Sequence, residues 1–483
     1  MSAAQGPGAR GRSRAKSGRG GRAPRSPARG GAPAAVAGQT LEHRMLLTAT
    51  MCLLAFGAVM VYSASSATTL LTGGGYGDGY LVKFLVYGAV GLVAMRVLAR
   101  DGVAKVHAIT APLLAISFVL VAAVHVPHLG VSVNGARRWI GPGALQFEPS
   151  ELMKLALVLY AATLLAKRPH SVHDLRELAR PLLSVVGAAC LLVFTQPDLG
   201  TAMVIAFTVG AMLIAAGMAP RKLALVAGGV LTLVLLYALV RPYARARLTS
   251  FIDPWAHASG SGFQAVQGQI AIGSGGLFGV GPGQSVQKIF YLPEAQTDFI
   301  LAVIAEELGM VGVFALLFLY GLIAYAGLRA AKAARSLYSA LIAVGVTALV
   351  LSQAVLNAFA VLGLAPLTGV PLPFVSYGSS SLIVMLAAMG LLLNVASGAT
   401  GHVRAVAPTQ RPARRAPIAP AAARAGAARG PAAAVAGGAA RFAGPREPAR
   451  WGGDGRRAED RDRDGRDRGA RGAGAGGGGR AAG

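Results

Sequence analysis

Carboxylates and one lysine gather in a short stretch, residues 288–307, which reads KIFYLPEAQTDFILAVIAEE. Its ionisable residues are Lys288, Glu294, Asp298, Glu306 and Glu307. They lie at the start of a long apolar segment or within it, where a charge is costly unless it is paired or functional. A short polar residue often caps a helix, and either Thr297 or Asp298 could do so here. Capping needs only one such residue, so the other carboxylates indicate a functional site.

Two further groups of polar residues lie at the ends of apolar runs. Glu151 and Lys154 are three residues apart and therefore share one face of a helix. They form either part of a functional site or an ion pair that only positions the helix. Gln196 and Asp198 lie in a turn between two apolar runs, where an Asp is as well suited to helix capping as to catalysis.

The composition predicts the kind of structure that holds these residues. Of 483 residues, 54% are hydrophobic and only 14% are Asp, Glu, Lys or Arg, and the mean hydropathy is +0.54. That is too little charge to cover several soluble domains. Apolar runs of about twenty residues, the length of a membrane-spanning helix, recur between Met45 and Ala396. They lack the alternation of barrel strands, so the sequence predicts an all-α polytopic membrane protein.

The apolar runs predict about ten membrane-spanning helices. They lie near residues 45–64, 80–98, 107–126, 150–166, 182–195, 199–217, 222–240, 298–328, 338–362 and 374–396. A large outer loop, residues 241–297, separates the seventh span from the eighth. Within it Phe263, Val266 and Ile270 recur at helical spacing, which predicts a short helix at the membrane surface. The glycines that follow do not match a dinucleotide-binding pattern, and we expect them to supply only a flexible connection.

Basic residues predict the orientation, because short cytoplasmic loops are rich in Lys and Arg. With the N-terminus inside, the inner loops carry Arg96, Arg100, Lys105, Lys167, Arg168, Arg176, Arg180, Arg221, Lys222, Arg329, Lys332 and Arg335. The outer loops near residues 65–79, 195–198 and 363–373 contain neither Lys nor Arg. Both termini are therefore predicted to be cytoplasmic.

Two outer loops depart from this charge pattern. They contain Arg137 and Arg138 in the first loop, and Arg241, Arg245, Arg247 and Lys288 in the second. Basic residues placed against the topological bias favour binding of an anionic substrate on the outer face. The plainer alternative is that a few outer arginines occur in many membrane proteins without such a role.

The two ends of the chain, residues 1–44 and 398–483, differ from the middle, residues 45–397. They hold eighteen of the net twenty-six positive charges and are rich in Ala, Gly, Pro and Arg, which predicts disordered cytoplasmic tails. A basic tail beside a membrane favours contact with anionic lipid headgroups, and we predict no nucleic-acid partner.

Cys52 and Cys190 lie in apolar runs and predict neither a disulfide framework nor a metal cluster.

A set of ordered motifs gives the sequence a family resemblance. They are VYSASS at 61–66, NGARRWI at 134–140, EPSELMK at 148–154, QPDLGTA at 196–202, RLTSFIDPW at 247–255, QKIFYLPEAQTDFI at 287–300, EELG at 306–309 and PLTGVPLPFVSYGSSS at 366–381. Between about Glu42 and Val395 the chain resembles the polytopic cell-wall polymerases of the shape, elongation, division and sporulation (SEDS) family. It resembles the division branch, the FtsW type, more than the elongation branch, the RodA type. One departure is Glu148, which stands where the family pattern usually has Gln.

The resemblance implies a peptidoglycan glycosyltransferase that joins lipid II units outside the cytoplasmic membrane, with undecaprenyl diphosphate leaving. Asp298 matches the family's catalytic aspartate and would accept the proton of the acceptor hydroxyl in one inverting displacement. Residues that would line the substrate site or neutralise the diphosphate are Arg137, Arg138, Glu151, Lys154, Gln196, Asp198, Arg245, Arg247, Lys288 and Glu294. A divalent cation, Mg²⁺ or Mn²⁺, could share that neutralisation, and the expected partners are a class B penicillin-binding transpeptidase and the division complex.

Two other functions are compatible with about ten spans and buried charges. A lipid II flippase or transporter would place its site near the membrane midplane in broken helices, whereas the charges here gather at one face. A non-catalytic scaffold of the division complex would use the tails for docking and would not need Asp298.

Overall fold

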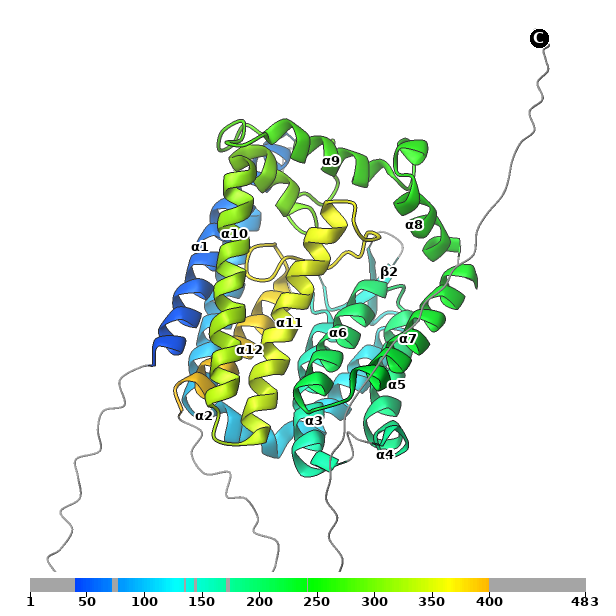
Figure 1. The fold of residues 1–483 in the computed structure, drawn as a ribbon. Helices are drawn as coiled ribbons and strands as arrows, with labels where there is room; N and C mark the ends of the chain where they lie inside the picture. The colour runs from blue at the N-terminus through cyan, green and yellow to red at the C-terminus, as the bar shows by residue number, and fades with distance from the viewer. Residues whose placement is uncertain are drawn as a thin grey trace, which may run out of the picture. The chain divides into compact units, whose positions relative to one another are not determined.

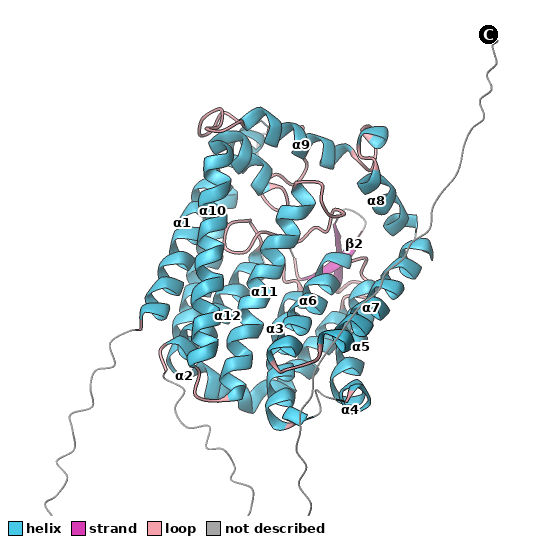
Figure 2. Ribbon diagram, in the orientation of Figure 1, coloured by secondary structure: helices cyan, strands magenta, loops and turns pink. Residues whose placement is uncertain are grey.

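The computed structural model describes residues 40–71, 77–133, 136–142, 146–170, 174–240 and 242–398. The predicted tails, residues 1–44 and 398–483, lie almost wholly outside these described residues, so their predicted disorder stays a prediction. The part that is described is a bundle of long helices with shorter elements gathered at one end (Figures 1 and 2). The predicted all-α membrane fold is confirmed.

Eight segments of the described residues are long and apolar enough to cross a membrane. They are α1 (Leu41–Leu71), the two halves of α2 (Gly79–Arg100 and Gly102–Ala123), α3 (Pro149–Lys167), Arg176–Phe194, α10 (Ile300–Ala333), α11 (Leu337–Val361) and α12 (Ser379–Ala396). Two more predicted spans correspond to the helices α6 (Leu199–Ala215) and α7 (Pro220–Val240), of 17 and 21 residues. The count of ten crossings stays a prediction.

The second and third predicted spans form one helical hairpin, α2 (Gly79–Ala123). Its middle is held by Asn394 of α12, whose Nδ2 donates to the carbonyls of Ala99 and Arg100 at 2.9 and 2.8 Å. Both ends of α2 lie at the opposite end of the bundle, where Tyr80 stacks edge-on against Tyr377 and the Val121 carbonyl accepts from Gln196. If α2 were straight, its two ends would be about 67 Å apart. Since both ends lie at the same end of the bundle, α2 turns back near residue 101, between its two apolar halves.

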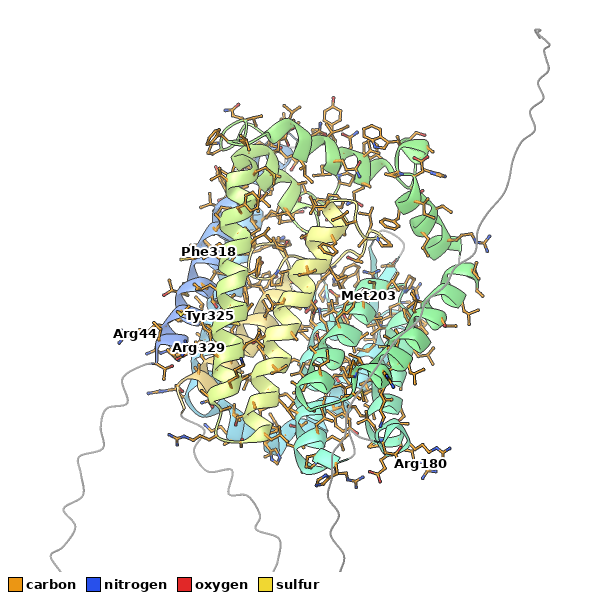
Figure 3. All side chains as sticks on the ribbon, viewed as in Figure 1. Arg44, Arg180, Met203, Phe318, Tyr325 and Arg329 are labelled. Atoms are coloured by element: carbon orange, nitrogen blue, oxygen red, sulfur yellow. The ribbon has the colours of Figure 1, made fainter. Side chains whose placement is uncertain are left out.

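The first and last helices of the bundle are joined at one end. Thr40 Oγ1 donates to the carbonyl of Ala396 at 2.8 Å, which connects the start of α1 to the end of α12. Arg329, near the end of α10, forms an ion pair with Glu42 at 3.1 Å. Arg44, Arg180 and Arg329 all lie at this end, opposite α9 (Figure 3). The start of α1 and the end of α12 therefore lie at the same end of the bundle, as the predicted even number of crossings requires.

The opposite end of the bundle carries most of the short elements. They are the antiparallel strands β1 (Gly130–Val133) and β2 (Ala136–Ile140), the helices α8 (Pro242–Ile252) and α9 (Phe263–Gly275), and the 3₁₀ turn Trp255–His257. The predicted helix around Phe263 is confirmed as α9, whereas β1 and β2 were not predicted. Val131, Val133, Ala136 and Trp139 supply the apolar and β-branched residues that favour a pleated pair, with a bulge at Val131 and Ser132.

The fifth predicted span contains a change of helix type. It consists of α4 (Leu175–Leu178), a π-helical turn at Ala179–Leu183 and α5 (Ser184–Phe194). Pro181 lies in the π turn, where its missing N–H does not interrupt a regular α-helical ladder.

Helix α10 is broken at Gly309, which has φ 66° and ψ −164°. The glycine-rich segment 276–281 crosses this break: the N–H groups of Val280 and Gly281 donate to the Glu306 and Glu307 carbonyls, at 2.9 and 3.0 Å. A methyl group at Gly279 would lie 2.1 Å from the Glu307 carbonyl oxygen, so only glycine fits. The expectation that these glycines merely provide flexibility is therefore wrong, because the backbones meet too closely for a side chain.

Candidate active site

Asp298 lies in the turn before α10, at the end of the bundle that carries α8 and α9. The N-cap of α10 is Phe299, which makes no side-chain capping bond. Thr297 instead donates to the carbonyl oxygen and a carboxylate oxygen of Glu294, at 3.1 and 3.2 Å. Neither Thr297 nor Asp298 is the N-cap, because the cap lies two residues after Thr297 and one after Asp298.

The backbone around Asp298 is fixed by Asn357 of α11. Its Nδ2 donates to the Asp298 carbonyl and to the Val370 carbonyl, each at 2.8 Å. One amide thus joins α10 and α11 to the loop 363–378. Sequence analysis missed Asn357, although an amide near the end of an apolar helix is a signal that could have been used.

Asp298 and Arg138 both face Gly369, which has a positive φ of 69°. A methyl group at Gly369 would lie 3.4 Å from Asp298 Oδ2 and 3.7 Å from Arg138 Nη1. The two head groups are therefore no farther apart than the sum of these distances, although they are 160 residues apart in the chain. Asp298 also lines a small pocket with Asn357, Thr368 and Gln264 of α9. The fold thus brings a carboxylate and a guanidinium to the same glycine, with the carboxylate and the glycine lining this pocket.

The two predicted arginines, Arg137 and Arg138, lie on opposite faces of strand β2. Successive residues of a strand point to opposite faces, so Arg138 is buried and Arg137 is exposed. Arg138 Nε donates to the Gln196 carbonyl at 3.2 Å, Nη2 donates to the Pro197 carbonyl, and Nη1 lies 3.7 Å from Asp198. The structure therefore brings Arg138 into the site and leaves Arg137 on the surface.

Gln196 and Asp198 position Arg138 from the turn between α5 and α6. Gln196 Nε2 donates to the Val121 carbonyl of α2 at 2.7 Å. Asp198 is the N-cap of α6 and accepts from the Thr201 N–H at 3.1 Å, so its predicted capping role is confirmed. Because the same carboxylate also faces Arg138, capping and a place in the site are not alternatives.

Glu151 and Lys154 form a buried ion pair at the start of α3. Lys154 Nζ lies 2.9 Å from Glu151 Oε1, and both residues are at most 2% exposed. Glu148, the N-cap of α3, lies beside them and accepts from Ser150 Oγ at 2.9 Å. Its backbone N–H donates to Ser380 Oγ at 3.1 Å, which ties α3 to the start of α12.

Burial, with the nearby negative charges of Glu151 and Asp198, raises the pKa of the Glu148 carboxyl to about 8, against the lowering effect of Arg138 and Lys154. At neutral pH this carboxyl is therefore mostly protonated and uncharged. A neutral Glu148 has the shape and polarity of the glutamine that the family pattern carries here. Glu148 therefore differs little from a glutamine at pH 7, and the difference grows as the pH rises and the carboxyl becomes charged.

We expect Glu148→Gln to reduce the loss of stability between about pH 4.5 and pH 8. The carboxyl has its ordinary pKa of 4.5 in the unfolded chain and a pKa of about 8 in the folded one, so stability falls as the pH rises through this interval. The amide does not ionise and removes this contribution. Thermal unfolding of the detergent-purified protein at several pH values measures the effect. Glu177→Gln, at an exposed carboxyl on α4, is the control, and equal pH slopes for Glu148→Gln and the unmodified protein would contradict the assignment.

No described contact places the remaining four predicted site residues beside Gly369; they are Lys288, Arg245, Arg247 and Glu294. Lys288 is 3% exposed, and its Nζ donates to Glu307 Oε1, Ser63 Oγ and the Gly283 carbonyl at 2.8, 3.1 and 2.8 Å. These bonds use all three hydrogens of the ammonium, so Lys288 fastens its loop to α1 and α10 in this conformation. Arg245 is exposed on α8. The side chain of Arg247 lies outside the described residues, and Glu294 contacts Thr297.

The fold and the site define a polytopic membrane protein whose ionisable residues converge at one end of its helix bundle. The family model FTSW_RODA_SPOVE, described as cell cycle protein, matches residues 43–400. The chain belongs to this family, as the motifs predicted.

Related proteins cover nearly the same part of the chain. Stage V sporulation protein E of Bacillus subtilis strain 168 is 40% identical over 361 residues, which are 74% of this chain and 97% of that protein. The probable peptidoglycan glycosyltransferase FtsW of Coxiella burnetii is 40% identical over 360 residues, 73% of this chain and 95% of that protein. Residues outside the matched region belong mainly to the two tails.

Two solved structures share the fold. One, from work on "Structural coordination of polymerization and crosslinking by a peptidoglycan synthase complex", has a TM-score of 0.60 and 32% identity and covers 73% of this chain and 96% of that one. The crystal structure of the rod shape determining protein RodA of Thermus thermophilus has a TM-score of 0.54 and 32% identity, with 73% of this chain and 95% of that one covered.

Proposed function

We propose that the chain is a peptidoglycan glycosyltransferase that joins lipid II units into glycan strands during cell division. The observation that carries the proposal is the convergence of Asp298 and Arg138 on Gly369, at the end of a membrane-embedded bundle. Relatives named as probable peptidoglycan glycosyltransferases cover the whole bundle at about the same identity as the sporulation relative. A carboxylate and a guanidinium beside one glycine suit an acceptor hydroxyl and a leaving diphosphate.

Asp298 acts as the general base of this reaction. Its carboxylate accepts the proton of the acceptor's 4-hydroxyl while that oxygen bonds to the anomeric carbon of the donor sugar. The bond from that carbon to the diphosphate oxygen breaks, and the diphosphate leaves with its electron pair. A single displacement of this kind inverts the anomeric carbon. Fixing the Asp298 backbone through Asn357 holds the base in one place, which is the requirement for efficient proton transfer.

Arg138 stabilises the negative charge that develops on the diphosphate. A guanidinium matches phosphate oxygens in a bidentate manner, and a buried one acts through a lower dielectric than water. The backbone carbonyls of Gln196 and Pro197 and the carboxylate of Asp198 hold Arg138 in position from the side. Lys154 supplies a second buried positive charge, and it lowers the pKa of the Glu148 carboxyl as Arg138 does.

A divalent cation would share the work of neutralising the diphosphate. Among the residues that the structure describes, no three Asp, Glu, His or Cys side chains gather as a metal site. Asp298 is the carboxylate that lines the pocket beside Gly369, and a Mg²⁺ or Mn²⁺ ion there would take most of its ligands from the substrate's diphosphate and from water. The cation would supply charge neutralisation of the leaving group.

The protein is proposed to lie in the bacterial cytoplasmic membrane with both termini inside and the site outside, at the division septum. The joined ends of α1 and α12 and the arginines Arg44, Arg180 and Arg329 at that end support this orientation through the excess of positive charge on cytoplasmic loops. A class B penicillin-binding transpeptidase and the division complex are the proposed partners. The structural relative reported from a synthase complex that couples polymerization and crosslinking supports the first of these.

Reconstitution separates the proposed enzyme from the two alternative functions. The purified chain, with its transpeptidase partner, is incorporated into vesicles that contain fluorescent lipid II. Glycan strands that a lysozyme digest removes are the expected product. Transfer of lipid II between leaflets without strand formation would favour a flippase. Neither activity in a complex that still assembles would favour a scaffold.

A further inference from the structure

A set of buried polar atoms beside the site has no hydrogen-bond partner among the described residues. These atoms are Glu151 Oε2, both amide atoms of Gln353, Asn357 Oδ1 and Thr368 Oγ1. All four residues are at most 1% exposed. Lys154 adds to the set, because an ammonium has three hydrogens and its nitrogen donates only to Glu151 among the described groups. A buried polar group without a partner costs about 1–3 kcal/mol, so one such atom would be an exception and a group of them calls for a ligand.

Helix geometry places Gln353 of α11 beside the Glu151–Lys154 pair of α3. The two helices touch where a methyl group at Gly345 would lie 2.6 Å from Val158. Glu151 precedes Val158 by seven residues and so lies in line with the contact, whereas Gln353 follows Gly345 by eight and lies about 80° around α11 from it, within the same buried stripe. The helices run in opposite directions, and both steps lead toward the Asp298 end by about 10 to 12 Å. Gln353 and Glu151 therefore lie at nearly the same depth on facing helices.

Asn357 extends this group to the catalytic carboxylate. It lies one helical turn above Gln353 on the same face of α11, and its Nδ2 holds the Asp298 backbone. Asn357, Thr368 and Asp298 line the same pocket. The unpartnered atoms thus extend from the pocket that contains Asp298 down to the buried ion pair, with the amide of Gln353 between them.

We propose that these groups hold a file of buried water molecules that connects Asp298 to Glu151, with Gln353 as its central positioning residue. Water is the ligand that fits, because the group presents both donors and acceptors and is bordered by a lysine, which disfavours a bound cation. Each buried water usually makes about three hydrogen bonds to polar groups of this kind. The inference rests on the proposed function only for its role in the reaction.

The file gives the proton on Asp298 a route out of the site. After the displacement, Asp298 is protonated and must lose this proton before the next acceptor can be activated. The proton passes along the waters to Oε2 of Glu151, while each water gives up one proton and receives another. No electron or further reactant is required. Glu148 is protonated at neutral pH and partly exposed, so it first loses its own proton to solvent; Glu151 is restored when it passes the proton on to Glu148.

Radiolytic labelling tests for the waters without relying on activity. Pulsed X-rays generate hydroxyl radicals from bound water, which oxidise adjacent side chains that bulk solvent does not reach. In the unmodified full chain in detergent, we expect oxidation of Leu356, which is 5% exposed and lies one turn from Gln353 on α11. Leu386 of α12, which is fully buried and packs against Gly91 of α2, should stay unlabelled. Equal, background-level labelling of both would overturn the proposal, whatever the protein's activity.

A variant pair tests the role of the file in catalysis. Gln353→Met keeps the side-chain volume and removes both polar atoms, and we expect about a tenfold lower kcat with an unchanged KM for lipid II. The solvent deuterium isotope effect on kcat should rise, because proton release becomes slower. Gln353→Glu keeps a hydrogen-bonding group and should recover most of the rate. The control is Thr347→Val, which removes another buried unpartnered atom of α11 that packs instead on Gly327. A Gln353→Met protein with normal rate and isotope effect would contradict the relay.

Discussion

Asp298→Asn should abolish glycan strand formation while leaving the fold intact. An amide of the same shape cannot accept the hydroxyl proton, and the loss of a general base lowers the rate by about 10² to 10⁴-fold. The main-chain contacts of this residue, including the Asn357 bond to its carbonyl, do not depend on the carboxylate. We therefore expect an unchanged melting temperature and retained lipid II binding. The measurement is strand length and initial rate in the reconstituted assay.

A second aspartate at the same end of the molecule provides the control for this result. Asp253 is exposed after α8 and caps the Ala256 N–H at 3.0 Å, without a described contact to the site. Asp253→Asn should keep most of the polymerase activity. Strand formation by Asp298→Asn at the normal rate would remove the general base from the proposed mechanism. Growth of cells that carry only this variant would point to the scaffold function instead.

Arg138→Lys should lower both polymerase activity and stability. A lysine keeps the positive charge but cannot reach the Gln196 and Pro197 carbonyls and Asp198 together, because it lacks the planar fork. Removing one partner of a buried ion pair leaves the other uncompensated, which typically costs about 3–5 kcal/mol. The separation of 3.7 Å and the retained charge put Arg138→Lys at the lower end of this range. We expect kcat/KM for lipid II to fall about a hundredfold.

A double variant separates the two roles of Arg138. Arg138→Met removes the charge and leaves the buried Asp198 carboxylate unmatched, and adding Asp198→Asn removes that carboxylate's charge. The double variant should regain part of the melting temperature lost in Arg138→Met and none of the polymerase activity. Recovery of activity together with stability would show that Arg138 only supports the fold. Arg137→Met, at the exposed neighbouring position of β2, should change stability by no more than about 0.5 kcal/mol.

The sequence alone determined the membrane fold and predicted where the candidate site lies along the chain. An apolar run long enough to cross a bilayer can be recognised without knowing how the helices pack. Hydropathy alone therefore predicted the helices α1, α3, α10, α11 and α12. Local spacing also predicted the helix α9 and the cap at Asp198. Family motifs, carried by side chains such as Asp298, predicted the chemistry. These features depend on neighbours in the chain or on a pattern that is shared with relatives.

Which charges share the site was decided only by the tertiary structure. Arg137 and Arg138 are equivalent in the sequence, and the pairing of β2 with β1 buries one and exposes the other. Lys288 is close to Asp298 in the sequence, but the break in α10 at Gly309 and the loop that crosses it engage its ammonium with Glu307. Both outcomes depend on contacts between segments far apart in the chain. Burying a charge or a backbone carbonyl requires a partner, and only the folded arrangement determines which partner is within reach.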